Sequence, residues 1–296
     1  MEKAAVHQRY AVVTGSNKGI GFETVRQLAL EGIKVVLTSR DSKKGLEAVE
    51  KLKESAGLSH ENVLFHQLDV TDPASIASLV SFIKNQFGKL DILVNNAGIL
   101  GMIIDFTRAK TLDGGPPKAE DITTETFEAA EECLNTNYYG AKKMVDAFLP
   151  LLQLSDSARI VNVSSSVGLL KNIPNERIKQ ELNDVENLTE DRLDELLNKF
   201  IKDFKEGLLE KEGWPAKRSA YFLSKAFLNA YTRILAKKYP QLLVNCVCPG
   251  LVKTDITYNF GDLTAAEGAQ SPVRLALLPH GGLSGYFFSR HEMSCF

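Results

Sequence analysis

A glycine-rich loop follows the first apolar run of the chain. After Tyr10–Val13, the sequence Thr14-Gly15-Ser16-Asn17-Lys18-Gly19-Ile20-Gly21 opens a segment with helical periodicity. Glycine lets the backbone come close to a pyrophosphate, and the free N–H groups of a helix N-terminus attract its charge. The spacing is GxxxGxG rather than the commoner GxGxxG. Between a strand and a helix, this loop predicts a dinucleotide-binding α/β fold, with cofactor contacts from Gly15, Asn17, Lys18, Gly19, Ile20 and Gly21.

The rest of the chain repeats the alternation of strand and helix. Further short apolar runs lie at residues 35–38, 63–68, 92–94, 160–163 and 244–247, with a weaker one at 285–288. Segments with helical periodicity lie near residues 20–31, 42–54, 73–87, 125–152 and 219–238. Such alternation is typical of right-handed βαβ units, and uninterrupted apolar strands fit a sheet that is covered on both faces. We therefore predict an α/β fold with a doubly wound parallel sheet of the Rossmann-like kind.

Two stretches interrupt the alternation. Residues 101–122 are irregular and contain the turn signal Gly114-Gly115-Pro116-Pro117. Residues 169–215 are rich in charge, and within them Leu188–Leu209 has helical spacing. Because nucleotide-binding and catalytic signals interleave along nearly the whole chain, we expect one domain spanning residues 1–296. The stretch 169–215 is interpreted as a helical insertion packed on that domain.

Charge and composition argue against several kinds of partner. The formal net charge of −2 gives no reason to expect nucleic acid or an anionic membrane. No run approaches the roughly 18 apolar residues of a membrane-spanning helix, and the N-terminal MEKAAVHQRY leaves no room for a signal peptide. A cytoplasmic protein is therefore expected. Cys246 and Cys248 lie in an apolar strand without a neighbouring cluster of His or Cys, so we expect packing there and no metal site.

The end of the second strand indicates which nicotinamide cofactor binds. An acidic residue there would bind the ribose hydroxyls of NAD, whereas an Arg accommodates the 2′-phosphate of NADP. This chain has Arg40, with Lys18 in the glycine-rich loop and Lys44 shortly after. The planar donors of a guanidinium match phosphate oxygens. Asp41 would favour NAD if it turned inward, and Lys43 is interpreted as part of a solvated helix face. NADP(H) is the predicted cofactor.

Further motifs follow in order along the chain. They are Leu68-Asp69-Val70, Asn95-Asn96-Ala97-Gly98, Asn137-Tyr138-Tyr139-Gly140, Ser164-Ser165-Ser166, Tyr221-Phe222-Leu223-Ser224-Lys225 and Pro249-Gly250. Each is common by chance, but their order and spacing together with the glycine-rich loop are specific. On these motifs the chain resembles the classical short-chain dehydrogenases/reductases over nearly its whole length.

This resemblance implies roles for individual residues. Asp69 would meet the adenine, and Asn96 would line the cofactor. Ser165 would be the catalytic serine, because it lies three residues before Gly168, and Asn137 would hold a water in a proton relay with Lys225. The cofactor-binding residues outside the glycine-rich loop would be Arg40, Lys44, Asp69, Val70, Asn96, Tyr221 and Lys225, with Pro249, Gly250, Val252 and Thr254 from the loop that flanks the nicotinamide.

The tyrosine and lysine also indicate carbonyl reduction on chemical grounds. Reducing a ketone needs a hydride from NADPH and a proton for the developing alkoxide. A phenol with a pKa near 10 is a poor participant at neutral pH, but a nearby ammonium favours phenolate and lowers that pKa. Tyr221 and Lys225 are four residues apart and would share one face of a helix. Lys225 would thus tune Tyr221 and reach the nicotinamide ribose, while the Ser165 hydroxyl would donate to the substrate oxygen.

The interval between Ser165 and Tyr221 suggests one branch of the family. It holds 55 residues and ends in Glu212-Gly213-Trp214-Pro215. This resembles the carbonyl reductase branch, and especially the plant group of menthone reductases and salutaridine reductases. In tetrameric relatives the helix of Tyr221 packs against another subunit, whereas an insertion over that surface would cover it. The resemblance therefore implies a monomer.

The substrates of that group are bulky, mostly apolar ketones such as terpenoids and alkaloid precursors. A small-molecule ketone or alcohol is thus the expected partner. An enone C=C reductase on the same fold and a non-catalytic NADP(H)-binding regulator are the alternatives, and the retained Tyr221 favours carbonyl reduction. Asp105 would suit a cationic substrate nitrogen, although a surface carboxylate is the simpler interpretation. The expected substrate contacts are Ser165, Met102, Ile104, Asp105, Leu170 and Ile256.

Overall fold

One eight-stranded sheet forms the framework of the computed structural model, which describes residues 8–104 and 123–296. The strand order is β10-β9-β8-β7-β4-β1-β2-β3, and all neighbours are parallel except β9 and β10. The predicted doubly wound sheet is confirmed, with one antiparallel strand added at its edge. The strands are β1 (Tyr10–Val13), β2 (Lys34–Ser39), β3 (Val63–Gln67), β4 (Ile92–Asn95), β7 (Arg159–Val163), β8 (Leu243–Cys248), β9 (Phe287–Ser289) and β10 (Glu292–Ser294).

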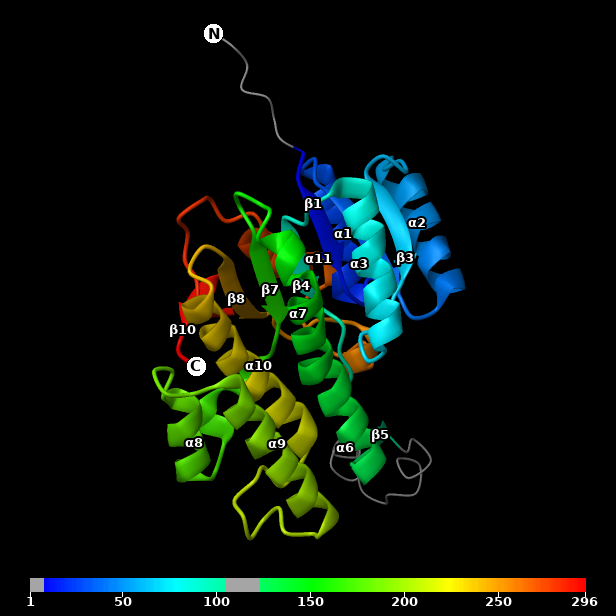
Figure 1. Ribbon diagram of the computed structural model, residues 1–296. Coiled ribbons are helices and arrows are strands. Elements are labelled where there is room, and N and C mark those ends of the chain that lie inside the picture. The colour runs from blue at the N-terminus through cyan, green and yellow to red at the C-terminus, as the bar shows by residue number, and fades with distance from the viewer. Residues whose placement is uncertain (1–7, 105–122) are drawn as a thin grey trace.

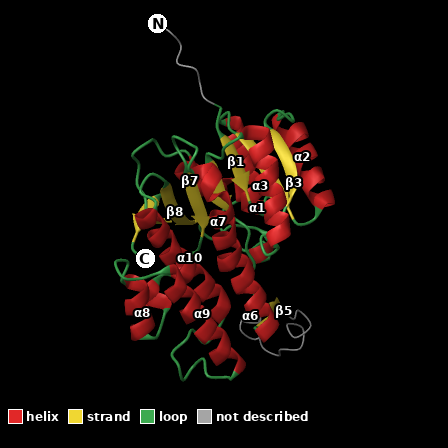
Figure 2. Ribbon diagram, viewed as in Figure 1, coloured by secondary structure: helices red, strands yellow, loops and turns green. Residues whose placement is uncertain are grey.

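Helices cover both faces of this sheet (Figures 1 and 2). One face is covered by α1 (Gly19–Leu30), α2 (Ser42–Ala56) and α11 (Ala265–Ala276), and the other by α3 (Pro73–Phe87), α7 (Gly140–Leu152) and α10 (Ser219–Lys238). Successive strand residues point into opposite cores. In β1, Val12 belongs to the core under α7 and α10, whereas Ala11 and Val13 belong to the core under α1. Burial on both faces explains why the strands are apolar throughout.

The long helical segment predicted near residues 125–152 is interrupted by a wider turn. It consists of α6 (Phe127–Leu134), the π-helical turn η1 (Asn135–Tyr139) and α7. Single π turns inside α-helices are frequently found at functional sites. Here the turn contains Asn137, one of the predicted catalytic residues.

The stretch 169–215 packs against α10 and α7. It forms η3 (Leu170–Asn172), α8 (Glu176–Asn183) and α9 (Glu190–Lys205), and Figure 1 shows α8 and α9 beside α10. Leu193 and Phe200 of α9 belong to the same hydrophobic core as α7 and α10. Ion pairs add to this packing: Lys142 of α7 lies 2.6 Å from Asp194, and Lys238 of α10 lies 2.8 Å from Glu190. The packing agrees with the interpretation of this stretch as a helical insertion.

Shorter elements follow strands β4, β7 and β8. β5 (Ile103–Ile104) pairs antiparallel with β6 (Thr123–Thr124), and residues 105–122 between them lie outside the described residues. The 3₁₀ turn η2 (Ser166–Gly168) follows β7, and η4 (Asp255–Thr257) follows β8. These turns bring two of the predicted site segments to the same edge of the sheet.

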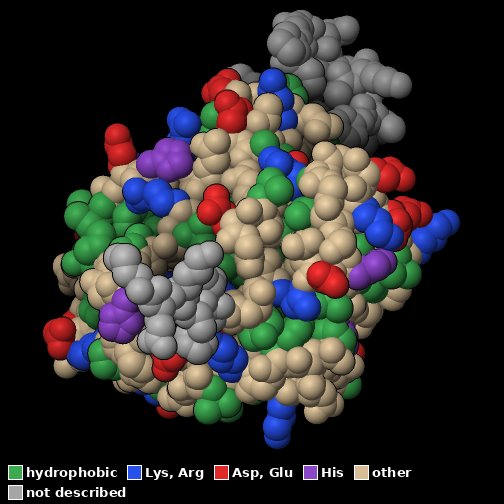
Figure 3. Space-filling view, turned by 90° about the horizontal axis from the view of Figure 1, so that it is seen from above, with side chains coloured by type: hydrophobic (Ala, Val, Ile, Leu, Met, Phe, Trp, Pro, Cys, Tyr) green, Lys and Arg blue, Asp and Glu red, His purple; other side chains and the backbone are tan. Residues whose placement is uncertain are grey.

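The surface carries charges of both signs. On the face shown in Figure 3, Lys and Arg side chains are interspersed with Asp and Glu, so that face has no continuous basic patch. In residues 8–104 and 123–296, no helix combines the length and the apolar character needed to cross a membrane. Cys246 and Cys248 are free and buried in β8, which confirms the prediction that they pack within a strand.

Candidate active site

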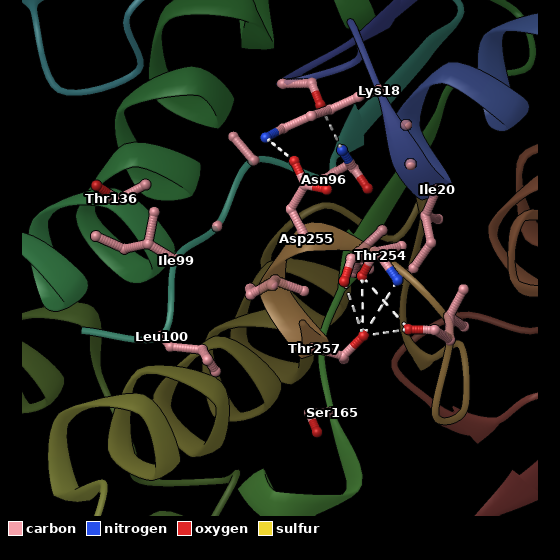
Figure 4. A pocket seen from close by; sticks show the side chains of 18 of the residues that line it. Lys18, Ile20, Asn96, Ile99, Leu100, Thr136, Ser165, Thr254, Asp255 and Thr257 are labelled. Carbon is pink, nitrogen blue, oxygen red and sulfur yellow. Dashed lines mark hydrogen bonds and ion pairs between the residues drawn. The ribbon is translucent and has the colours of Figure 1, made fainter. Parts of the chain in front are cut away.

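A cavity of about 910 Å³ opens at the carboxyl ends of the central strands (Figure 4). It lies where the strand order reverses, between β1 and β4, which is where doubly wound sheets bind ligands. The loops after β1, β2, β3, β4, β7 and β8 line it, together with residues from the start of α10. Every residue predicted to bind the cofactor is among the lining residues.

The glycine-rich loop is shaped for close approach to a ligand. Gly15 and Gly19 adopt φ values of 59° and 60°, a region that favours glycine. A Cβ atom on Gly21 would lie 2.4 Å from the side-chain nitrogen of Asn96, so no larger residue fits there. That nitrogen donates to the carbonyl oxygens of Thr14 and Gly15 at 2.9 and 3.0 Å. Asn96 therefore braces the loop as well as lining the cavity.

Cationic side chains surround one end of the cavity. Arg40 and Lys44 line it beside Asp41. The Asp41 carboxylate accepts a hydrogen bond from the Lys44 N–H at 3.1 Å and thereby caps α2. From the sequence alone, Asp41 could have favoured NAD by turning inward, but its carboxylate is engaged in this cap. Lys18 forms an ion pair with Asp255 of η4 across the cavity (Figure 4).

Tyr221, Lys225 and Ser165 come together where β7 approaches α10. Ser165 and Tyr221 both line the cavity, and their side chains lie close enough to influence each other. The Lys225 ammonium lies 5.8 Å from the centre of the Tyr221 ring and donates to the carbonyl of Val163 at 2.9 Å. A Cβ atom on Gly168 would lie 2.5 Å from the backbone of Lys225, so this glycine permits the close contact between η2 and α10.

The geometry separates Ser165 from its two neighbours. The hydroxyl of Ser164 is buried and donates to Asn229 at 2.6 Å, pointing into the core. Ser166 does not line the cavity, whereas Ser165 does. This placement favours the serine that the family resemblance implies.

Burial controls the protonation of the two central groups. It lowers the pKa of Lys225 from 10.5 to about 8. It raises the pKa of Tyr221, and the nearby Ser165 hydroxyl and the charge of Arg218 offset only part of this effect. In the chain alone, burial is the largest influence on the pKa of Tyr221 and raises it, so the lowering expected from the Lys225 ammonium does not dominate there. A phenol that remains protonated at neutral pH is a proton donor.

Asn137 lies one layer behind the cavity wall. Its carbonyl oxygen accepts from the N–H of Ile99 at 2.8 Å, and its amide donates to the carbonyl of Ile99 at 2.9 Å and to the Ser224 hydroxyl at 3.0 Å. A Cβ atom on Gly98 would lie 3.2 Å from Asn137 and 3.6 Å from the Lys225 ammonium. Asn137 thus joins the loop after β4 to the helix of Tyr221. Because Gly98 has no side chain, Asn137 can lie near Lys225.

The predicted substrate residues are placed less uniformly. Met102 and Ile256 line the cavity, but Leu170 does not: it is buried in the core that includes α10 residues, because η3 turns its side chain inward. Ile104 lies in β5, and Asp105 lies outside the described residues. Sequence reasoning missed further lining residues on α6 and η1 and in the loop after β8, although three of them recur at helical spacing. These are Ala129, Glu132, Thr136 and Asn259.

In the described part of the chain, no group of three or more His, Cys, Asp or Glu side chains is placed to hold a metal ion.

Comparisons with known proteins agree with this geometry. The family model for short chain dehydrogenase matches residues 9–176. The chain is 60% identical to (+)-neomenthol dehydrogenase of Arabidopsis thaliana, covering 97% of this chain and 98% of that protein. The solved structure of salutaridine reductase from Papaver somniferum superposes with a TM-score of 0.89 at 55% identity, covering 95% and 99% of the two chains. Carbonyl reductase [NADPH] 1 of Rattus norvegicus is 40% identical over 92% of this chain and 91% of its own length.

The fold, the motifs and these relatives converge on one assignment. The matched segment covers more than half of the chain, and the relatives align over nearly all of it. Family members bind nicotinamide cofactors and interconvert carbonyl and alcohol groups. The chain belongs to the short-chain dehydrogenase/reductase family, and it is an oxidoreductase that acts on CH–OH or carbonyl groups.

Proposed function

We propose that the chain reduces a bulky, apolar ketone of the terpenoid or alkaloid type to a secondary alcohol with NADPH. The observation that carries this proposal is the meeting of Tyr221, Ser165 and Lys225 in one cavity with the glycine-rich loop. The names of the plant relatives support the substrate class. The apolar side chains of Met102, Ile103 and Ile256 in the cavity wall suit a hydrocarbon skeleton.

The residues that line the cavity support a nicotinamide dinucleotide with a 2′-phosphate as the cofactor. The backbone of Gly15–Gly21 would bind the pyrophosphate, since no Cβ fits at Gly21. Arg40, with Lys44 and Lys18, would bind the 2′-phosphate, and Asp41 is held by its capping bond. The cofactor, when bound, supplies the hydride for the carbonyl carbon.

The chain itself handles the carbonyl oxygen. We propose that the Ser165 hydroxyl donates a hydrogen bond to this oxygen as negative charge develops. Tyr221, kept protonated by burial, transfers its phenolic proton to the oxygen and becomes phenolate. The Lys225 ammonium stabilises that phenolate, and Asn137 behind it would hold the water that returns a proton. A protonated phenol suits the reduction direction.

The test is NADPH oxidation by the purified chain against menthone, related terpenoid ketones and an alkaloid dienone, with chiral analysis of the product. Formation of one alcohol isomer from one ketone is the expected result. A saturated ketone formed from an enone would instead establish C=C reduction. Tight NADPH binding without turnover of either class would favour the non-catalytic regulator.

We further propose that the chain is a cytoplasmic monomer with one domain. The support is the packing of α8 and α9 on α10, which covers the helix that carries Tyr221. Light scattering of the purified chain should give the mass of one chain, and calorimetry should give one unfolding transition. A tetramer, or separate melting of the 169–215 insertion, would overturn these two points. Imaging of a fluorescent fusion in cells tests the location.

A further inference from the structure

The catalytic helix lacks a capping residue of its own. The position before its first residue is Arg218, which has a φ of 51° and makes no capping hydrogen bond through its side chain. The first amides of a helix have no partners inside the helix and need acceptors from elsewhere. The acceptor here is Glu125, 94 residues away in the sequence. One carboxylate oxygen of Glu125 accepts from the Ser219 N–H and the Ser219 hydroxyl, both at 2.9 Å, and the other accepts from the Ala220 N–H at 2.8 Å.

These bonds hold α10 directly beside its reactive side chain. Ser219 and Ala220 are the first two residues of α10 and are fully buried, and Tyr221 is the third. Because both carboxylate oxygens are used, the carboxylate restrains the helix against rotation about its axis as well as sliding along it. A negative charge at a helix N-terminus is also favourable toward the helix dipole.

Glu125 and Thr126 form a corner, residues 125–126, that caps two helices. The adjacent Thr126 caps α6 by accepting from the Ala129 N–H at 3.2 Å. α6 leads into the π turn that contains Asn137, and α10 packs against both. On its other side, Glu125 follows β6, whose partner strand β5 contains the cavity residue Ile103. The corner therefore joins the wall of the cavity to α10, which carries Tyr221 and Lys225, and to the helix that leads into the π turn of Asn137.

We propose that Glu125 is a positioning residue for the reaction: its carboxylate sets the position of α10 and so places the Tyr221 phenol against Ser165 and the substrate oxygen. Glu125 does not line the cavity, so it acts through the helix. This proposal rests on the proposed ketone reduction.

The test is the substitution Glu125→Gln, which removes the charge and replaces one acceptor oxygen with a donor. The expected result is a fall in kcat of about ten- to hundredfold, because displacement of a reacting group by about 1 Å can cost a factor of about 100. The Kd for NADPH should stay within about twofold, since its proposed binding residues lie mostly on other elements. Amide exchange in residues 216–224 should become faster. Glu125→Asp keeps the charge and should recover part of kcat.

Thr189→Ala is the matched control. Thr189 caps α9 by accepting from the Arg192 N–H at 3.1 Å, and no proposed site residue lies on that helix. It should lower the Tm through the loss of a cap and leave kcat within about twofold of the wild type. Wild-type kcat in Glu125→Gln, or an equal fall in Thr189→Ala, would overturn the proposal.

Two further results keep the test decisive. If Glu125→Gln does not fold, Ser219→Ala removes one of the three bonds, and an unchanged kcat there would overturn the proposal. If the wild type turns over no ketone, the proposed function fails separately. Faster exchange confined to residues 216–224 in Glu125→Gln would then still support control of the helix, and unchanged exchange would reject it.

Discussion

The two ends of the cavity are built in different ways. The cofactor end consists of short loops that each follow a strand directly, and backbone hydrogen bonds such as those from Asn96 to Thr14 and Gly15 hold them. The substrate end combines segments that are distant in sequence: residues 99–103, α6 and the later part of the loop after β8, residues 256–259. In that loop, Tyr258 and Asn259 have φ values of 53° and 59°. Residues with a side chain adopt this left-handed conformation only at a cost in conformational energy. Local sequence therefore determines the first end, and tertiary packing determines the second.

Tyr221 lies between these ends, and its replacement should separate binding from chemistry. Tyr221→Phe removes the proposed proton donor and leaves the ring in place. We expect kcat to fall by about 10² to 10⁴, the range typical of a lost general acid. Binding of NADPH, measured by fluorescence titration, should be unchanged. Turnover near the wild-type rate would refute the role assigned to Tyr221.

Lys225 also lies between the two ends of the cavity, and burying its ammonium group there costs stability. Its pKa is about 8 in the folded chain against 10.5 for a free lysine. The unfolded chain therefore binds more protons between these values, so the free energy of unfolding rises with pH across this window. The cost of burying Lys225 is complete below pH 8 and disappears above pH 10.5. The full cost is about 3 kcal/mol, because each pKa unit corresponds to about 1.4 kcal/mol.

Urea unfolding of Lys225→Met at several pH values measures this cost. Relative to this variant, the wild type should gain about 2 kcal/mol between pH 7 and pH 9.5. Burial also raises the pKa values of Cys133 and Cys246 to about 12, which opposes the gain above pH 9 in both proteins. This effect cancels in the difference for Cys246 but only in part for Cys133, because the charge of Lys225 lowers the pKa of that thiol. The exposed Lys84→Met is the control and should show a flat difference. A flat difference for Lys225→Met as well would contradict the burial argument.

Arg40 tests the cofactor end alone. Arg40→Ala should raise the Kd for NADPH by about ten- to hundredfold, because a hydrogen bond to a charged group contributes about 1.5–3 kcal/mol. The Kd for NADH, which has no 2′-phosphate, should change little. Lys43→Ala is a suitable control, because Lys43 does not line the cavity. Equal weakening of NADPH and NADH would mean that Arg40 does not recognise the phosphate.

Sequence reasoning identified the features that local sequence encodes and missed most of those that depend on tertiary packing. The glycine-rich loop and Arg40 were predictable because a strand, a turn and a helix start lie within a few adjacent residues. The helix α11 was missed, although its capping box of Thr264 and Glu267 is a local signal. The cap from Glu125 and the inward turn of Leu170 depend on contacts between distant segments, so no local pattern reports them. The raised pKa of Tyr221 was missed for a related reason, since burial is a property of the folded chain.

Ile256 tests the substrate end with the smallest expected effect. Its side chain is half-buried in the cavity wall on η4, so Ile256→Ala should weaken binding of a bulky terpenoid ketone by about 1 kcal/mol, or about fivefold in KM. The KM for a small ketone such as cyclohexanone and the Kd for NADPH should change less. Leu251→Ala is the control, because Leu251 precedes the same turn, is exposed and does not line the cavity. If Ile256→Ala weakened NADPH binding as much as binding of the bulky ketone, Ile256 would belong to the cofactor end together with Thr254, and the boundary between the two ends would lie beyond Ile256.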